Sequence, residues 1–264
     1  MDIVQKIFEM NNENIPFVVA TVISTKGSAP GKVGFKMLVE ADRRAEGTVG
    51  GGAIEERVKD DALQALAEGK SVTKDYLLSD KVEEKDNEIT VVPMKCQGKV
   101  SLFYEVYNSM PTVYVFGGGH VGQALLKVLR DLNYYSILVD NRKEYADKDI
   151  NSYASKIIHT DYIEYSNKFN PSNDSFIVIL THGHSYDYEI LHALYKRKIE
   201  ARYIGAIASA SKARELKSKL VKELGETIDV EKIHAPIGMK IGGTTAAEIA
   251  VSICAEIQSI RYQS

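Results

Sequence analysis

The chain has 264 residues, of which 44% are apolar and 26% are charged, and its formal net charge is −3. This composition is typical of a globular protein, and the absence of any long block of Lys or Arg indicates no nucleic-acid-binding surface. The first residues, "MDIVQKIFEMNNEN", lack a long apolar run and a small-residue cleavage site, and no apolar run approaches the length of a membrane span. We therefore expect a cytoplasmic protein without a signal peptide or a membrane segment.

The first half of the chain predicts a small α/β domain over residues 1–109. Residues 53–68 place Ile54, Val58 and Ala62 on one helical face, and Gly69 follows as a stop signal. Residues 41–47 are predicted to form a turn. A polar segment ending in a proline, residues 108–111, marks the expected domain boundary. The other predicted elements are a helix over 2–10 and strands over 17–25, 35–40, 71–79 and 99–107.

The second half, residues 110–264, alternates strands with helices. Such alternation predicts βαβ units and a parallel sheet. We therefore expect an α/β protein whose C-terminal domain is a Rossmann-like parallel sheet with helices on both faces. The predicted strands cover 113–116, 136–140, 156–159, 175–180 and 203–207, and the predicted helices cover 121–132, 185–198, 211–224 and 244–260.

The stretch "VYVFGGGHVG", residues 113–122, contains the most informative motif. Gly117, Gly119 and Gly122 satisfy G-x-G-x-x-G between a predicted strand and a predicted helix, and Gly118 and His120 lie between them. The glycines allow a tight turn, close approach of a pyrophosphate and close packing of helix on strand. Amide N–H groups at the helix start then face the anion. The alternative is a glycine-rich turn that binds no ligand.

Asp140 is the candidate acidic partner of this motif, because it closes the second strand of the unit, 18 residues after Gly122. A carboxylate at this place can accept hydrogen bonds from a ribose diol. It would repel the 2′-phosphate of NADP, although Arg142 lies two residues further on.

A glycine triplet and a glycine pair elsewhere in the chain also precede helices. Gly50, Gly51 and Gly52 lead into the helix over 53–68, and their amides are candidates for an anion-binding concavity; a simple turn is the alternative. In "IGGTTAAEIAVSI", Thr245 and Glu248 have the spacing of a capping box, which is sufficient to explain that helix start.

Histidine and cysteine candidates are fewer. A predicted strand is followed by His182, His184 and Asp187, so we expect these residues at the ligand crevice as polar loop residues. Metal binding is a weaker alternative for them, and we assign no metal site. Cys96 and His182 are the candidate catalytic residues. Cys96 could act as a nucleophile, sulfur carrier or metal ligand, or simply fill space, whereas Cys254 lies on an apolar helix face and is predicted to pack.

Several segments together resemble the XdhC/CoxI family, the accessory proteins of xanthine dehydrogenase and related molybdenum hydroxylases. In the first half these are "ATVISTKGSAPGKVGFKMLV" and "EGTVGGGAIEERV". In the second half they are "VFGGGHVGQAL", "LVDNRKEYAD", "LTHGHSYDYEIL", "RYIGAIASASKARE" and "HAPIGMKIGGTTAAEIAVSICAEI". The resemblance covers nearly the whole chain and implies an XdhC/CoxI-like domain over 1–109 and an XdhC Rossmann-like domain over 110–264.

The resemblance implies a chaperone that binds the molybdenum cofactor while a cysteine desulfurase supplies its terminal sulfur, and then hands it to the molybdenum hydroxylase apo-enzyme. It also implies a possible homodimer. The sequence departs from the family pattern, because Ala53 occupies a family cysteine position and Gln97 follows Cys96 where the family has glycine. A mechanism that needs two cooperating thiols is therefore in doubt.

We expect the ligand to lie between Gly50–Gly52, the Gly117–Gly122 loop and His182–Asp187. The sequence does not distinguish molybdopterin from its dinucleotide form or from NAD(P). Two other functions stay open: an NAD(P)-dependent oxidoreductase, for which His182 or Lys212 is a candidate proton donor, and a nucleotide-sensing regulatory protein.

Overall fold

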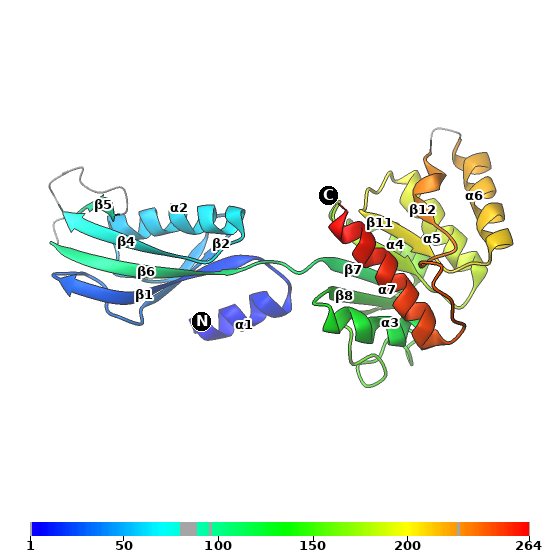
Figure 1. Cartoon of the computed structure of the whole chain (residues 1–264), viewed down its shortest axis with the longest axis horizontal. Coiled ribbons are helices and arrows are strands. Elements are labelled where there is room, and N and C mark those ends of the chain that lie inside the picture. The colour runs from blue at the N-terminus through cyan, green and yellow to red at the C-terminus, as the bar shows by residue number, and fades with distance from the viewer. Residues whose placement is uncertain (1, 80–88, 95–96, 226–227, 264) are drawn as a thin grey trace. The chain divides into compact units, whose positions relative to one another are not determined.

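The computed structural model describes residues 2–79, 89–94, 97–225 and 228–263, without the side chain of His184. The chain divides into two compact units, Met1–Ser109 and Met110–Ser264 (Figure 1). Within the described residues, no helix is long and apolar enough to cross a membrane.

The first unit is a sheet with one helix on each face (Figure 1). The strand order is β3-β2-β1-β6-β4-β5, and only the pair β4–β5 is parallel. Helix α2 (Ala53–Glu68) packs on one face through Ile54, Val58 and Ala62, and α1 (Ile3–Asn12) packs on the other. The strands are β1 (Phe17–Gly27), β2 (Lys36–Glu40), β3 (Ala45–Gly47), β4 (Val72–Ser79), β5 (Ile89–Pro93) and β6 (Gly98–Tyr107).

Most predicted elements of this unit are present. Helix α2 has the predicted bounds and ends at Gly69, which has a φ of 65°. The turn predicted over 41–47 is wrong in its second part, because Ala45–Gly47 pairs with β2 as strand β3. Strand β5 was not predicted, because it is short, lacks apolar alternation and is fixed by its pairing with β4.

The second unit is a parallel six-stranded sheet in the order β12-β11-β10-β7-β8-β9. Read from β9, this is the doubly wound order 3-2-1-4-5-6, with its switch point between β7 and β10. The Rossmann-like parallel sheet predicted from the sequence is therefore confirmed. The strands are β7 (Thr112–Phe116), β8 (Tyr135–Asp140), β9 (Lys156–His159), β10 (Phe176–Ile179), β11 (Tyr203–Ala206) and β12 (Ile233–His234).

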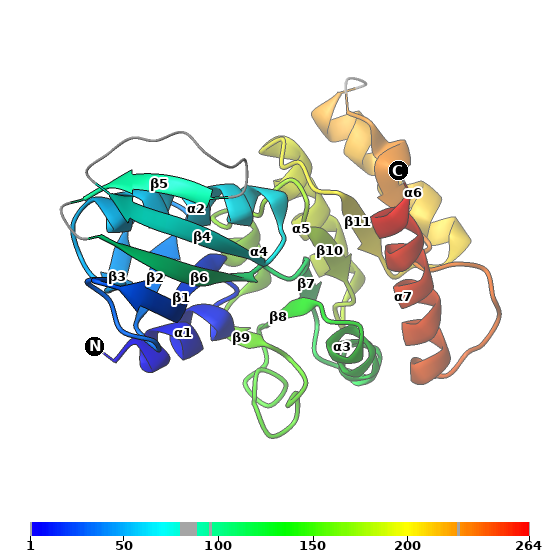
Figure 2. The ribbon, with the colours of Figure 1, turned by 60° about the vertical axis from the view of Figure 1, so that its left-hand side comes forward.

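Helices cover both faces of this sheet, as predicted. Figure 2 shows α3 (His120–Asp131) and α7 (Ala246–Tyr262), which pack against each other and share one core cluster with the sheet. The other face carries α4 (Tyr162–Ser166), α5 (His184–Lys196) and α6 (Ala210–Leu224). Neither the five-residue α4, the two-residue β12 nor the short 3₁₀ segment Val230–Lys232 was predicted, because such short elements carry no periodic pattern.

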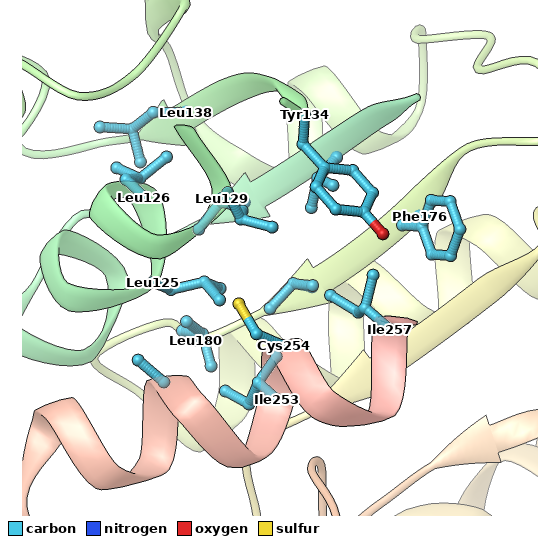
Figure 3. Packing of buried hydrophobic residues seen from close by; sticks show 14 of the residues in the cluster. Leu125, Leu126, Leu129, Tyr134, Leu138, Phe176, Leu180, Ile253, Cys254 and Ile257 are labelled. Atoms are coloured by element: carbon cyan, nitrogen blue, oxygen red, sulfur yellow. The ribbon is translucent and has the colours of Figure 1, made fainter. Parts of the chain in front are cut away.

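The predicted packing role of Cys254 is confirmed. Its sulfur lies in the apolar cluster between α3 and α7, near Leu125 and Leu129 (Figure 3). The side chain is 3% exposed, and burial raises the pKa of the thiol to about 12. A thiol held neutral in this way is unreactive near neutral pH.

A buried carboxylate ties α2 to the sheet of the first unit. Asp61 is 2% exposed and accepts hydrogen bonds from Arg57 at 2.9 and 3.1 Å, from Lys74 at 2.7 Å and from the Tyr76 hydroxyl at 2.7 Å. The Tyr76 hydroxyl is also hydrogen-bonded to that of Tyr104. Burial opposes ionisation of Asp61, but the hydrogen bonds from Lys74, Tyr76 and Arg57 outweigh it and lower its pKa.

We predict that Asp61→Asn lowers the free energy of unfolding of this unit by about 3 kcal/mol, because it removes the anion from a buried ion-pair cluster. The folded pKa lies below the ordinary value of 3.8, so the stabilisation is complete above pH 3.8 and is lost as the pH falls through the folded value. Urea unfolding at pH 7 and pH 2.5 measures the free energy of unfolding of both proteins. The variant should fall further below the unchanged protein at pH 7 than at pH 2.5.

The matched control is Asp60→Asn on the same helix. Asp60 is exposed and forms a surface ion pair with Arg43, at 2.9 Å, so its loss should change stability by less than about 1 kcal/mol. Equal effects of the two substitutions would contradict a special role of Asp61.

Candidate functional site

The Gly117–Gly122 loop begins where β7 ends, at the switch point of the parallel sheet. Gly117 has a φ of 115°, and a Cβ there would lie 2.3 Å from the carbonyl oxygen of Leu180. A Cβ on Gly122 would lie 2.1 Å from the carbonyl oxygen of Gly117. The first and third glycines are therefore required by backbone packing, which brings the ends of β7 and β10 together.

Gly119 is different, because neither its conformation nor its surroundings require glycine. Its φ is −68°, and the atom nearest to a Cβ at this position would be Nη2 of Arg142, at 4.0 Å. Helix α3 begins directly after Gly119, and the amide of Gln123 donates a hydrogen bond to the carbonyl of Gly119. In the described part of the chain, the amides of Gly119, His120 and Val121 have no hydrogen-bond acceptor. This open backbone at a helix start suits an anion.

Asp140 lies beneath the loop and holds it. Its side chain is fully buried, and Oδ2 accepts a hydrogen bond from the amide of Gly118 at 2.7 Å. Arg142 donates to the same carboxylate from its amide at 2.9 Å, from Nε at 3.0 Å and from Nη2 at 2.8 Å. Burial opposes ionisation, but the bonds from Arg142 and Gly118 lower the pKa of Asp140.

These bonds occupy the carboxylate, which offers roughly four acceptor positions in all. A ribose diol could reach Asp140 only by displacing Arg142 or the loop amide. Direct binding of ribose by Asp140 therefore stays a prediction, whereas the role that its contacts support is to position the loop.

Arg142 supplies a cation at the same helix start. Its side chain is 23% exposed, and the guanidinium stacks on the ring of Tyr145 at 3.9 Å. The hydrogen bond to Asp140 raises its pKa, so the group stays protonated. From the sequence, Arg142 is expected only to modify the effect of Asp140, because its position beside Gly119 depends on the fold.

Two buried polar atoms near the loop have no partner among the described residues. Asn151, 1% exposed, donates to the carbonyls of Gly118 at 3.2 Å and Tyr145 at 2.7 Å, but its Oδ1 is unpaired. The hydroxyl of the fully buried Tyr162 is also unpaired. Burial, followed by the charge of Asp140, raises the pKa of Tyr162, so it is a neutral hydroxyl. Neither residue belongs to a sequence motif, so neither was predicted as part of the site.

The segment after β10 carries the predicted histidines. His182 is exposed, and its ring lies 6.4 Å from that of Tyr162 and 5.3 Å from that of Tyr186. Asp187 is 2% exposed, and its Oδ1 accepts a hydrogen bond from Thr181 at 2.5 Å. The described side chains include no group of three or more His, Cys, Asp or Glu residues that could hold a metal ion. The side chain of His184 and all of Cys96 lie outside the description, so their roles stay predictions.

The other predicted anion site, Gly50–Gly52, is filled by the chain itself. Oε1 of Glu55 accepts hydrogen bonds from the amides of Gly51 at 2.8 Å and Val49 at 3.3 Å, and from the hydroxyl of Thr48 at 2.5 Å. A phosphate at this place would have to displace the carboxylate of Glu55, and the negative charges of the two groups would repel each other. The structure therefore does not support the prediction that these three glycines bind an anion.

The start of α7 is closed in the same way. Oε2 of Glu248 accepts hydrogen bonds from the amides of Thr244 and Thr245, each at 2.9 Å, and the predicted capping box is confirmed. In α2 and α7 the third helical residue is a glutamate, whereas in α3 it is Gly122. The α3 start stays open because that position has no side chain to fold back onto it.

Known proteins resemble the chain over both units. Residues 113–257 match the family model of the XdhC Rossmann domain, and residues 11–77 match that of the XdhC and CoxI family. The Escherichia coli (strain K12) protein YqeB is 29% identical over 266 residues, which cover 99% of this chain and 46% of YqeB. A probable xanthine dehydrogenase subunit of Bacillus subtilis (strain 168) is 26% identical over 161 residues, which cover 61% of this chain and 46% of that protein.

The chain thus spans less than half of the length of these two curated relatives. A crystal structure of a xanthine dehydrogenase from Bacillus halodurans matches with a TM-score of 0.53 at 20% identity and covers 100% of this chain and 97% of that one. This last likeness shows a shared fold. The match to the family model over residues 113–257, more than half of the chain, leads to a separate conclusion: the chain belongs to the XdhC/CoxI family.

Proposed function

We propose that this chain is an accessory protein of a xanthine-dehydrogenase-type molybdenum hydroxylase, and that it holds the molybdenum cofactor by its phosphate at the start of α3. The observation that carries the proposal is the open helix start formed by Gly119, His120 and Val121, with the guanidinium of Arg142 beside it. The cofactor is the cargo of the protein, which binds it and later releases it to the apo-enzyme.

The chemistry of molybdopterin fits this site. Molybdopterin carries a phosphate, and its dinucleotide form carries a pyrophosphate. Open helix amides bind such groups through charge-assisted hydrogen bonds and through the positive end of the helix dipole. Arg142 adds a planar donor that stays charged, because Asp140 fixes it from below.

The same geometry favours phosphate recognition over recognition of a ribose diol. The only described group at the end of β8 that reaches the loop from the exposed side is the cation of Arg142, since Asp140 is fully buried. A Rossmann unit is compatible with NAD(P). Hydride transfer also requires a proton donor aligned with the substrate, and no contact among the described residues supports that role for a particular side chain. We therefore favour molybdopterin, or its dinucleotide, as the ligand.

The finer steps of the role rest on family membership. Sulfuration of the cofactor by a cysteine desulfurase, transfer to a molybdenum hydroxylase apo-enzyme and homodimer formation are parts of this proposal. Ala53 leaves only Cys96 as a thiol that the family pattern would place near the cofactor. The sulfur would therefore come from the partner desulfurase, and this chain would contribute binding and protection. A site shared by both units stays a prediction.

We predict that Gly119→Val weakens binding of molybdopterin at least about tenfold, because the side chain covers amides whose hydrogen bonds to a charged group contribute about 1.5 kcal/mol or more each. The unit should stay folded, since the φ of −68° and the open surroundings accept a side chain. Isothermal titration calorimetry measures the affinity, and thermal unfolding checks the fold.

The control is Ala247→Val on the exposed face of α7, which should leave the affinity within twofold of the unchanged protein. Gly117→Ala, in contrast, should destabilise the unit through its clash with Leu180. Equal affinity of the Gly119→Val variant and the unchanged protein would rule out this helix start as the phosphate site.

We predict that Arg142→Met weakens binding of inorganic pyrophosphate about tenfold and makes the remaining affinity less sensitive to salt, because one cation of the site is lost. Lys143→Met removes an exposed neighbouring cation and should change the affinity less than twofold. Titrations at 50 and 300 mM salt provide the comparison, and identical behaviour of the two variants would exclude Arg142 from the site.

The accessory role predicts transfer. Unchanged protein loaded with molybdopterin should restore activity to the apo-form of a xanthine dehydrogenase from the same host, and Gly119→Val protein at equal concentration should restore markedly less. Oxidation of NADH or NADPH by this chain alone with small carbonyl compounds would instead indicate an oxidoreductase.

A further inference from the structure

A cavity of about 280 Å³ lies between α5 and α6, at the edge of the sheet where the parallel strands end. Ile207 and Ala208, which follow β11, line it, together with Asp187 in the first turn of α5. The predicted site includes only Asp187 of these residues. The volume of the cavity is at the lower end for ligand pockets, so the cavity has room for one ring system and not for a dinucleotide.

The walls of this α5–α6 pocket combine an apolar surface with polar groups. Ile207, Ala208 and Leu216 supply the apolar part. Asp187 is 2% exposed, and the hydroxyl of Thr181, at 2.5 Å, fixes the orientation of its carboxylate. Lys212, from the first turn of α6, also lines the pocket. Such a mixture suits a flat polar heterocycle, which needs apolar contact on its faces and directed bonds at its edge.

A buried hydroxyl at the wall of the pocket lacks a well-formed hydrogen bond. Tyr188 lines the pocket and is 7% exposed, and its hydroxyl has no hydrogen-bond partner among the described residues. Burial, followed by a contact of the hydroxyl with Glu223 and then by the charge of that carboxylate, raises the pKa of Tyr188 to about 12, so the hydroxyl remains a donor. Lys219 Nζ lies 3.6 Å from the centre of its ring. A buried polar group without a partner costs free energy that a ligand would recover.

The position of the pocket relates it to the phosphate site. Strands β7, β10 and β11 are adjacent in the sheet, and neighbouring strands lie about 4.8 Å apart. The end of β11 is therefore about 10 Å from the end of β7, where α3 begins. A ligand with a phosphate at one end and a ring system at the other can span this distance.

We propose that the α5–α6 pocket binds the pterin ring system of the ligand, with the carboxylate of Asp187 accepting hydrogen bonds from its 2-amino-4-oxo edge. This assignment rests on the proposed function and adds the half of the ligand that the helix start does not contact. A 2-amino-4-oxo ring presents adjacent N–H donors, which a fixed carboxylate accepts side by side. The 4-oxo group accepts a hydrogen bond from a cation such as Lys212.

The test uses 2-amino-4-oxopteridine and inorganic pyrophosphate as separate probes of the two halves, each titrated calorimetrically against the full chain. Ala208→Trp fills the pocket, and Asp187→Asn keeps the shape of the side chain but removes its charge. Both substitutions should weaken binding of the pteridine at least tenfold and leave that of pyrophosphate within twofold. Gly119→Val should have the opposite pattern, and Ala247→Trp, on exposed α7, should change neither affinity.

The outcomes separate the two proposals. Pteridine binding that is absent from the unchanged protein, or equal in the unchanged protein and both pocket variants, overturns the pterin assignment whatever pyrophosphate does. Pyrophosphate binding that is indifferent to Gly119→Val overturns the proposed phosphate site, even if the pteridine depends on Asp187. Circular dichroism identifies a misfolded Ala208→Trp protein, in which case Asp187→Asn alone decides.

Discussion

The proposed phosphate site depends on one buried interaction, in which the carboxylate of Asp140 accepts hydrogen bonds from the amide of Gly118 and the side chain of Arg142. This contact links the end of β8 to the turn between β7 and α3. It fixes the turn whose next amides, from Gly119 to Val121, have no acceptor among the described residues. It also places the guanidinium of Arg142 beside them. Without this carboxylate, neither the loop nor the cation would be held where an anion can meet both.

The three glycine-containing helix starts show how one residue changes the use of a backbone. Glu55 and Glu248 each stand third in their helices and bind the amides that precede them. Gly122 stands third in α3, where close packing against Gly117 excludes a side chain. The requirement for packing therefore also keeps the helix start open. This open start is the feature on which the proposed binding of a phosphorylated ligand rests.

Sequence patterns predicted the long elements well, because apolar periodicity over ten or more residues records burial directly. The helix at 53–68 and the parallel alternation after residue 112 are examples. Strands β3, β5 and β12 were missed because partner strands, rather than their own residues, fix them. At the site, the spacing of Gly117, Gly119 and Gly122 identified the loop. The spacing could not show that Asp140 binds the loop from within the protein or that Glu55 accepts the hydrogen bond of the Gly51 amide. It also could not show that Asn151 and Tyr162 lie near the loop. All of these facts depend on tertiary contacts.

Amide chemical shifts offer the most direct measurement of the central claim. A titration of ¹⁵N-labelled protein with molybdopterin reports on each backbone N–H group separately. The account predicts large, saturable shifts for Gly119, His120 and Val121, with little change at Gly51 and Thr245, whose amides already bind glutamates. Shifts at Gly51 or Thr245 without any at Gly119 would contradict it.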